Sequence, residues 1–278
     1  MGRDSGYSRE GYLRENYHYF HLRDTAGQER DFHFHEFDKI VLLLSGRVEY
    51  AVESAVYKLK PWDVLLVKHH SIHKAIIDKS EPYERIIIYL DRQYFQRVSP
   101  DTPLLECFEA ADRQGGRLLQ PGEGQRRELG AAIDAYERAV GDRRFGAQAL
   151  RDTLITQLLI QVGRMSDAAP ERFEARCDAK IREALSYINE NLGRELTVEA
   201  LAEKVYLSKY HFMRLFKAQT GSTVHAYVRQ KRLLCAARMI REGLPANKAA
   251  EDSGFTDYSA FHRAFRESFG ISPGQLKK

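Results

Sequence analysis

Three histidines near the start of the chain are the residues best suited to bind a metal ion or a small molecule. His33 and His35 are separated by one residue, so on a strand both side chains would point to the same face of a sheet. With His73 they form a three-histidine set of the kind that binds zinc, iron or nickel. The same imidazoles could instead hydrogen-bond a small molecule in an apolar pocket, or have only a structural role.

A second set of polar side chains lies near the C-terminus, in residues 254–270. Asp257 suits a helix N-cap, and Gly270 suits a left-handed C-cap. Between them phenylalanine recurs every four residues, which predicts a helix with one aromatic packing face. The opposite face combines hydrogen-bond donors with positive charge, which suits a helix in a DNA groove. Its residues are Tyr258, Ser259, His262, Arg263 and Arg266.

The same pattern occurs 49 positions earlier, in residues 207–221. Ser208 takes the place of the cap, and Gly221 that of the stop. One such segment alone is typical of an ordinary amphipathic surface helix, whereas a repeat of cap, aromatics, cations and stop glycine is not expected by chance. Two such helices could enter successive major grooves about 34 Å apart. The exposed side of this first helix is expected to carry Lys209, Tyr210, Met213 and Arg214.

Charge is distributed unevenly along the 278 residues, which are enough for two domains. Residues 179–278 contain 17 Lys and Arg against 10 Asp and Glu, whereas the remaining residues contain 26 against 29. A basic C-terminal third beside a slightly acidic remainder indicates a module that binds a polyanion at one end.

The cysteines, the termini and the motifs exclude several classes of protein. Cys107, Cys177 and Cys235 are odd in number and widely spaced, which favours reduced thiols over a disulfide framework or a zinc site. The N-terminus lacks the apolar segment of a signal peptide, and the longest apolar runs are too short to cross a bilayer. We expect a cytoplasmic protein with no membrane partner. Phosphate loops and a Gly-x-Ser-x-Gly motif are absent, so we predict neither an enzyme nor a cofactor.

Short strands are predicted throughout residues 17–91, because β-branched and aromatic runs alternate with turn residues such as Ser45-Gly46 and Lys60-Pro61-Trp62-Asp63. Closely spaced strands without intervening helices favour a small antiparallel barrel or sandwich. The predicted strands are residues 17–22, 40–44, 47–52, 55–59, 64–67, 74–77 and 84–90.

The period of the apolar residues becomes helical after about residue 104, with helices predicted over residues 126–140 and 145–165. One apolar stripe in the second helix could pack on the strands or meet its copy across a two-fold axis. The stripe consists of Leu150, Leu154, Leu158, Leu159, Val162 and Met165. Residues 166–178 contain Ala-Ala-Pro and mixed charge, and form the predicted linker.

The C-terminal segment is predicted to be entirely helical. A helix over residues 180–191 is expected to end at Gly193, and another to begin behind Thr197. A long helix over residues 224–242, stopping at Gly243, joins the two repeat units, and a short helix follows Pro245. Each unit is thus a helix, a tight turn and a second helix, the helix-turn-helix arrangement.

These residues resemble the AraC/XylS-type transcription regulators over almost all of residues 179–278. The first unit carries the resemblance in Leu201-Ala202, Ser208, Phe212-x-Arg214-x-Phe216-Lys217 and Gly221, and the second in Ala250, Gly254-Phe255, Phe261-x-Arg263-x-Phe265-Arg266, Gly270 and Ser272-Pro273. The resemblance implies a seven-helix DNA-binding domain whose exposed residues, named above, contact bases. Arg214 and Arg263 would each suit a guanine O6/N7 pair, and the alternative is that either arginine contacts only phosphate or caps a neighbouring helix. Met213 departs from a polar contact residue and suits a thymine methyl group.

Residues 15–91 resemble the cupin-type sensor of this family, through His33-Phe34-His35, Ser45-Gly46, residues 57–63 and Ile72-His73. Metal-binding cupins have a glutamate four residues after the second histidine, where this chain has Lys39. A cation there disfavours a metal, so we predict a small-molecule pocket that the resemblance associates with a sugar or sugar acid. The predicted ligand-binding residues are His33, His35, Lys39, His73 and Arg85, with the three histidines as the set for any metal.

The predicted fold class is α+β, with two domains: a cupin-like β-barrel with a helical dimerisation segment in residues 1–165, the linker, and an all-α domain in residues 179–278. The predicted function is that of a bacterial, ligand-responsive regulator, a homodimer that binds double-stranded DNA and, if an activator, contacts RNA polymerase. The alternatives are a metal-cupin oxygenase fused to a DNA-binding domain and a ligand-independent DNA binder whose pocket is filled by side chains.

Overall fold

The computed structural model describes residues 13, 15–24, 33–53, 55–69, 71–114, 118–168 and 178–277. The chain forms two compact units, one built mainly from residues up to Ala175 and the other mainly from Arg176–Lys278. Most of the predicted linker, and Cys177, lie outside the described residues, so the linker stays a prediction.

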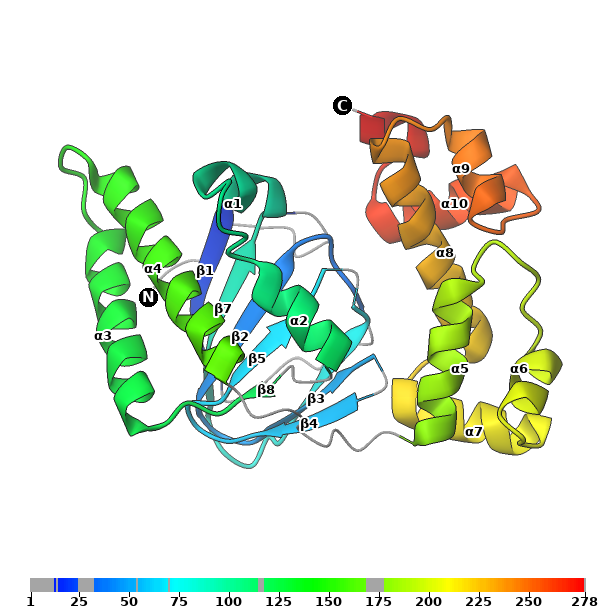
Figure 1. Ribbon diagram of the computed structural model, residues 1–278, viewed down its shortest axis with the longest axis horizontal. Helices are drawn as coiled ribbons and strands as arrows, with labels where there is room; N and C mark the ends of the chain where they lie inside the picture. Colours follow the sequence, from blue (N-terminus) through cyan, green and yellow to red (C-terminus); the bar gives the residue numbers. More distant parts are fainter. Residues whose placement is uncertain are drawn as a thin grey trace. The chain divides into compact units, whose positions relative to one another are not determined.

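The described part of the first unit contains two sheets, and the chain passes from one to the other several times, so their strands are interleaved in the sequence (Figure 1). The five-stranded sheet has the order β1-β7-β2-β5-β8, and its neighbouring strands are antiparallel. The three-stranded sheet has the order β4-β3-β6. The strands are β1 (Tyr17–Asp24), β2 (Asp38–Ser45), β3 (Val48–Val52), β4 (Ala55–Leu59), β5 (Val64–Val67), β6 (His73–Ile77), β7 (Tyr83–Leu90) and β8 (Leu118–Leu119). The seven strands predicted from residue patterns are confirmed, and the cupin-like fold with them.

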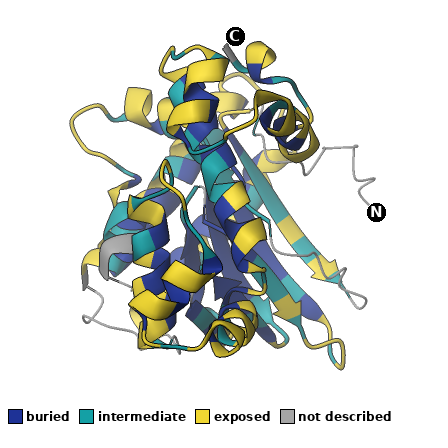
Figure 2. Ribbon diagram, turned by 90° about the vertical axis from the view of Figure 1, so that its right-hand side faces the viewer, coloured by how far each residue is buried: buried dark blue, intermediate teal, exposed yellow. Residues whose placement is uncertain are grey.

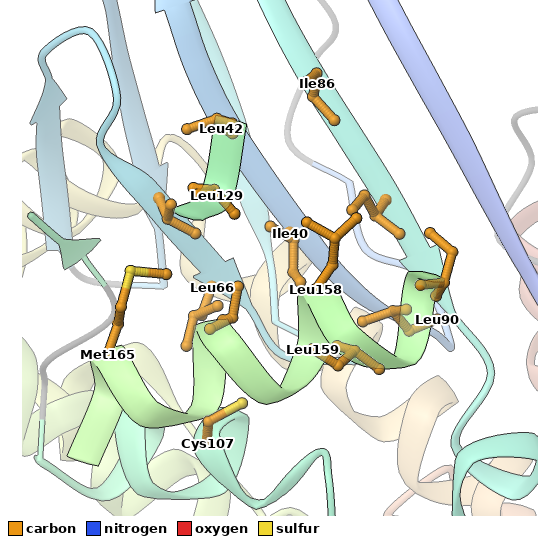
Figure 3. Packing of buried hydrophobic residues seen from close by; sticks show 14 of the residues in the cluster. Ile40, Leu42, Leu66, Ile86, Leu90, Cys107, Leu129, Leu158, Leu159 and Met165 are labelled. Atoms are coloured by element: carbon orange, nitrogen blue, oxygen red, sulfur yellow. The ribbon is translucent and has the colours of Figure 1, made fainter. Parts of the chain in front are cut away.

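Strand β2 is buried on both faces, because helices cover one face of its sheet and the other face is turned to the interior of the β-structure. Ile40 and Leu42 pack in a hydrophobic cluster with residues of the helices, as Figure 3 shows. Side chains alternate along a strand, so Lys39 and Leu43 lie on the opposite face. In β7, Tyr89 pairs with Lys39 and Arg85 pairs with Leu43, so both lie on that face.

The described residues of the first unit form four helices: α1 (Arg92–Val98), α2 (Glu106–Gln114), α3 (Glu123–Val140) and α4 (Ala147–Ala168). The two long helices confirm the helical pattern of the sequence. Helix α1 is absent from our predictions because it is short and buries one apolar side chain, Phe95, which leaves little periodicity to detect. Its start is nonetheless well defined, since the Asp91 carboxylate accepts a 2.7 Å hydrogen bond from the backbone N–H of Tyr94.

The apolar stripe of α4 packs on the five-stranded sheet over most of its length (Figure 3). Leu158, Leu159, Val162 and Met165 are buried in the same cluster as the sheet residues. Leu154 is partly buried, and Leu150 is 45% exposed. The stripe was predicted either to pack on the strands or to meet its copy in a dimer. Its buried residues pack on the strands of the same unit.

The second unit is built from helices: α5 (Ala179–Glu190), α6 (Val198–Lys204), α7 (Lys209–Thr220), α8 (Val224–Arg241), α9 (Ala246–Asp252), α10 (Tyr258–Phe269) and the 3₁₀-helix η1 (Pro273–Lys277). The two predicted recognition helices, α7 and α10, have the expected caps. Ser208 accepts from the backbone N–H of His211 and Asp257 from that of Ser259, at 3.4 and 2.8 Å. Both helices end at a left-handed glycine with φ of 69°.

The aromatic rows of α7 and α10 form the packing faces of these helices. Phe212 and Phe216 are fully buried, with ring centroids 5.6 Å apart, and Phe216 meets Tyr227 of α8 edge-on. Phe261 and Phe265 repeat this arrangement at 5.3 Å. Alternating buried and exposed stripes are visible along the helices in Figure 2. Since each aromatic row faces inward, the polar rows are left on the surface.

Gly193 does not end helix α5, and this prediction was wrong. The helix stops at Glu190, with Asn191 as its C-cap. The Asn191 side chain donates a 2.9 Å hydrogen bond to the carbonyl of Tyr187, so a side chain satisfies a last-turn carbonyl that backbone N–H groups satisfy at a glycine cap. Gly193 lies beyond the cap, in the loop before α6.

Among the described helices, none combines the length and the apolar character needed to cross a lipid bilayer.

The packing of α4 predicts unequal effects for two leucines of the same stripe. Leu158→Ala should lower the free energy of unfolding by about 2–5 kcal/mol, because it leaves a cavity in a buried cluster. Leu150→Ala is the matched control and should change it by less than about 0.5 kcal/mol, since Leu150 is largely exposed. Urea unfolding measures both, and equal losses would contradict this packing.

Candidate functional site

Helix α7 presents its predicted DNA-contacting residues to solvent. Tyr210 and Met213 are 85% and 41% exposed, large values for apolar side chains, and Lys209 and Arg214 are exposed beside them. Buried Phe212 interrupts this row, as the helical period requires. The exposed surface therefore combines an aromatic ring, a thioether and two cations.

Helix α10 presents an equivalent surface. Tyr258, Ser259 and Arg263 are exposed, whereas His262 is half-buried, with its ring centroid 6.2 Å from that of Tyr258. Tyr258 also contacts buried Phe261, at 5.7 Å between centroids. These ring contacts restrict the tyrosine at the N-terminus of the helix, the end that enters the groove in helix-turn-helix proteins.

Lys209 has a carboxylate partner that residue patterns did not indicate. Its Nζ lies 2.5 Å from Oε1 of Glu199, in the first turn of α6. The hydrogen bond to Glu199 and the charge of this carboxylate raise the pKa of Lys209. Acidic residues are common in first turns because they complement the helix dipole, so the presence of Glu199 in the sequence did not predict an ion pair with Lys209. The pair joins the first helix of the motif to the second.

The three histidines converge in the first unit. The backbones of His33 and His73 form an antiparallel bridge, with N–H···O distances of 3.1 and 2.9 Å. One ring nitrogen from each of the three residues lies within 4.8 Å of the others, and the ring centroids of His35 and His73 are 4.7 Å apart. His35 and His73 are buried. The expectation that His73 joins the His33-x-His35 pair thus agrees with the geometry.

Two of these imidazoles have their tautomers defined by the backbone. Nδ1 of His35 lies 3.0 Å from the carbonyl oxygen of Phe37, and Nδ1 of His73 lies 2.9 Å from that of Ser71. A carbonyl oxygen only accepts, so each Nδ1 carries the proton and each Nε2 is a hydrogen-bond acceptor. An Nε2 lone pair is what a metal ion or a ligand hydroxyl group requires.

Lys39 competes with a metal ion for one of these lone pairs. It is 5% exposed, and its Nζ lies 3.5 Å from Nε2 of His73. Burial, together with the charge of Lys39, holds the pKa of His73 well below its ordinary value, so this imidazole is neutral at neutral pH. The histidines have the ligand type and spacing for a divalent metal, but an ammonium group occupies the place of an anionic fourth ligand.

Arg85 lies on the same face as Lys39 but at the other end of the strands. Arg85 pairs with Leu43, which lies four positions from Lys39, roughly 13 Å along the strand. The guanidinium of Arg85 forms a 2.5 Å ion pair with Asp24 and lies over the ring of Tyr83 at 4.3 Å. The structure therefore separates Arg85 from the histidines, which pattern reasoning had grouped together.

Two tyrosines occupy the space between these cations. The hydroxyl oxygens of Tyr50 and Tyr83 are 3.3 Å apart, and Nζ of Lys39 lies 5.7 Å from the ring of Tyr50. Burial raises the pKa of both phenols, so both stay protonated and can donate and accept hydrogen bonds. We did not predict them as site residues, although the alternation along residues 48–52 could have placed Tyr50 inside.

Buried Asp38 holds the strand that carries Lys39. Its Oδ1 accepts hydrogen bonds from the backbone N–H and Nδ1 of His69 at 2.7 and 2.9 Å, and its Oδ2 accepts from Nε of Arg92 at 2.9 Å. Arg92 also donates to Glu109 of α2 at 2.8 Å. Burial alone raises the pKa of Asp38, but the hydrogen bonds and charges of His69 and Arg92 outweigh it, and the pKa is lowered.

Two family models match the chain and together cover most of it. A model described as an AraC-like ligand binding domain matches residues 16–159, and a model described as a helix-turn-helix domain matches residues 201–278. Both matches agree with the folds described above.

Three similar proteins are regulators by name. The probable transcriptional regulator LumQ of Photobacterium leiognathi is 25% identical over 90% of this chain and 93% of its own length. The transcriptional activator RhaS of Salmonella arizonae is 26% identical over 88% of this chain and 87% of its own. The RCS-specific transcriptional activator RclR of Escherichia coli is 39% identical over 31% of each chain.

The Asp38 network predicts a specific dependence of stability on pH. Because the folded pKa of Asp38 lies below its ordinary value of 3.8, its charge stabilises the fold above that pH, and this contribution is lost as the pH falls further. Asp38→Asn should lower the free energy of unfolding at pH 7 by about 3–5 kcal/mol, and the difference should shrink towards pH 3. Chemical unfolding across this pH range measures it.

The control is Asp78→Asn, because this carboxylate is fully exposed and accepts a hydrogen bond from the N–H of Ser80, two residues away. It should leave stability at neutral pH almost unchanged. A loss for Asp38→Asn no larger than that for Asp78→Asn would contradict the role of the network.

Proposed function

We propose a mode of action that starts from one premise: the chain belongs to the AraC family of DNA-binding transcription regulators, with an AraC-like ligand-binding domain and a helix-turn-helix domain. A small molecule bound inside the first unit controls how the two recognition helices are presented to DNA. The observation that carries this proposal is the buried polar row of histidine, lysine and tyrosine side chains within a largely apolar β-structure. Buried polar groups with defined hydrogen-bond roles are typical of ligand pockets.

The DNA contacts are assigned to the matched surfaces of α7 and α10. Arg214 and Arg263 occupy equivalent positions, one residue before a buried or half-buried position of each helix, and both are exposed. An arginine in the major groove can donate two hydrogen bonds to O6 and N7 of guanine. Lys209, Tyr210, Met213, Tyr258, Ser259 and His262 complete the proposed contact surface.

The effector is proposed to be a sugar or a sugar acid. The Nε2 atoms of His35 and His73 accept hydrogen bonds, as hydroxyl groups require, and Lys39 can donate to a carboxylate or hydroxyl oxygen. Tyr50 and Tyr83 can do either. This mixture of acceptors, a cation and phenols matches a ligand with several hydroxyl groups better than an apolar one.

Regulation is proposed to follow a population shift. The effector favours one arrangement of a homodimer, and this arrangement presents the DNA-binding domains to adjacent half-sites. RhaS and RclR are activators by name, so we propose activation, with RNA polymerase as the partner. The relatives are regulators and not enzymes by name, so the histidines are assigned a binding role, without a catalytic step.

A divalent metal is the second candidate effector, because three imidazole nitrogens lie within 4.8 Å of one another. The backbone carbonyls that orient His35 and His73 resemble the outer partners of metal-bound histidines. The buried ammonium of Lys39 opposes this candidate, since it adds positive charge beside the same nitrogen atoms.

Base contacts by the two arginines lead to a distinct prediction for each. Arg214→Ala and Arg263→Ala should each weaken binding to the operator by about 1–3 kcal/mol and relax the base preference at a different sub-site. Selection of bound sequences followed by fluorescence anisotropy, with operator and random DNA, measures affinity and preference. The matched control is Arg266→Ala, an exposed arginine on the same helix as Arg263. Arg266→Ala should lower the affinity for operator and random DNA by the same factor, as the loss of a phosphate contact does. If Arg214→Ala and Arg263→Ala behave in the same way, these arginines contact only phosphate, and their assignment to bases is wrong.

A ligand screen separates the candidate effectors. Protein purified without a metal-affinity tag is tested by thermal unfolding against sugars, sugar acids and divalent metals. A ligand present at 100 times its Kd should stabilise the protein by ~2.7 kcal/mol. We expect stabilisation by a sugar or sugar acid, lost in Lys39→Met, whose side chain is similar in length but uncharged. Stoichiometric metal in the purified protein would favour the second candidate, and no response to any pool would favour a ligand-independent DNA binder.

A further inference from the structure

The two helix-turn-helix motifs touch through their backbones at two glycines. Gly193 lies in the loop between α5 and α6, and Gly254 in the turn between α9 and α10. A Cβ atom at Gly193 would lie 2.7 Å from the carbonyl oxygen of Asp252, closer than real side chains approach. A Cβ atom at Gly254 would overlap the carbonyl oxygen of Leu192, and the φ of +95° at this position also favours glycine. Only residues without side chains permit this contact.

Arg232 of the connecting helix α8 joins both sides of the contact. Its Nε donates a 2.9 Å hydrogen bond to the carbonyl of Leu192, and its Nη2 donates a 2.6 Å hydrogen bond to the carbonyl of Arg194. The same Nε lies 2.7 Å from where a Gly254 side chain would begin. The guanidinium thus holds the loop on either side of Gly193 and fills the space against Gly254. Its planar fork with fixed donors is what such a double contact requires, and a lysine could not reproduce it.

This contact is a second mechanical link between the recognition helices. Along the chain the motifs are joined by helix α8, which has 18 residues, and long helices bend. The contact of Arg232 and the two glycines, beside α8, restrains bending and twisting of one motif relative to the other. One base pair of DNA corresponds to about 3.4 Å of rise, whereas the Arg232 hydrogen bonds cannot lengthen by more than a few tenths of an ångström without breaking. The link is therefore stiff on the scale of a single base-pair step.

We propose that Arg232, with the glycine contacts at Gly193 and Gly254, sets the distance between α7 and α10 and thereby restricts the protein to one spacing between its two sub-sites. The inference rests on the proposed base contacts by both helices. Arg232 is a positioning residue: it acts through the Leu192–Arg194 loop. Arg232 controls how strongly the protein prefers one spacing between the sub-sites. It does not control the affinity for a single sub-site.

The test compares full-length variants on three DNA duplexes. Each carries both sub-sites of the selected operator, with zero, one or two base pairs inserted between them, and Kd is measured by fluorescence anisotropy. The wild type should bind the extended duplexes at least about tenfold more weakly, because one recognition helix loses its base contacts. Arg232→Ala should reduce this ratio to about threefold or less.

Two further variants keep the outcome interpretable. Arg238→Ala removes an exposed arginine of the same helix, whose partner is Glu242, and should keep the wild-type spacing ratio. If Arg232→Ala does not melt cooperatively, Gly193→Ala decides, since its Cβ forces the loop away from Asp252 and should also lower the ratio or shift the preferred spacing.

Wild-type spacing ratios in a folded Arg232→Ala or in Gly193→Ala would overturn the proposal. A wild type that binds all three duplexes equally would instead contradict the two-helix DNA contact on which the inference rests.

Discussion

The two-sided burial of strand β2 is the constraint on which the first unit depends. One set of alternating residues, including Ile40 and Leu42, packs on the helices, so the other set must point into the β-structure. Lys39 belongs to that second set and is buried by the register of its strand. A shift of one residue would exchange the two sets and place an ammonium in the helix-packed core. The hydrogen bonds to Asp38, at the start of the same strand, oppose such a shift.

The polar interior that results is defined by hydrogen-bond roles more than by charge. Backbone carbonyls assign the protons of His35 and His73, and burial keeps Tyr50 and Tyr83 protonated. An interior of this kind holds hydrogen-bond acceptors and donors at defined positions. The ammonium of Lys39 is unfavourable for a metal ion at the histidines, because it adds positive charge beside His73.

The second unit contains two similar helix-turn-helix motifs that contact each other. Aromatic rows in α7 and α10 are buried on one side, which leaves matched polar rows on the other. A pair of exposed faces recognises a composite site only if their separation is controlled. Gly193, Gly254 and Arg232 provide close contacts between the two motifs, and these contacts involve backbone carbonyls and one guanidinium.

The sequence by itself determined most of the secondary structure, the pairing of the two helix-turn-helix motifs and the exposed faces of α7 and α10, because these follow from local periodicity and caps such as Ser208 and Asp257. Short elements with one buried residue, such as α1, carry too little periodicity to be predicted. The sequence also grouped the three histidines, but tertiary structure decided which other polar residues meet. It separated Arg85 from the histidines, added Tyr50 and Tyr83, and changed Gly193 from a helix cap into a contact between motifs, because contacts between distant segments depend on strand register and loop path, which local patterns do not encode.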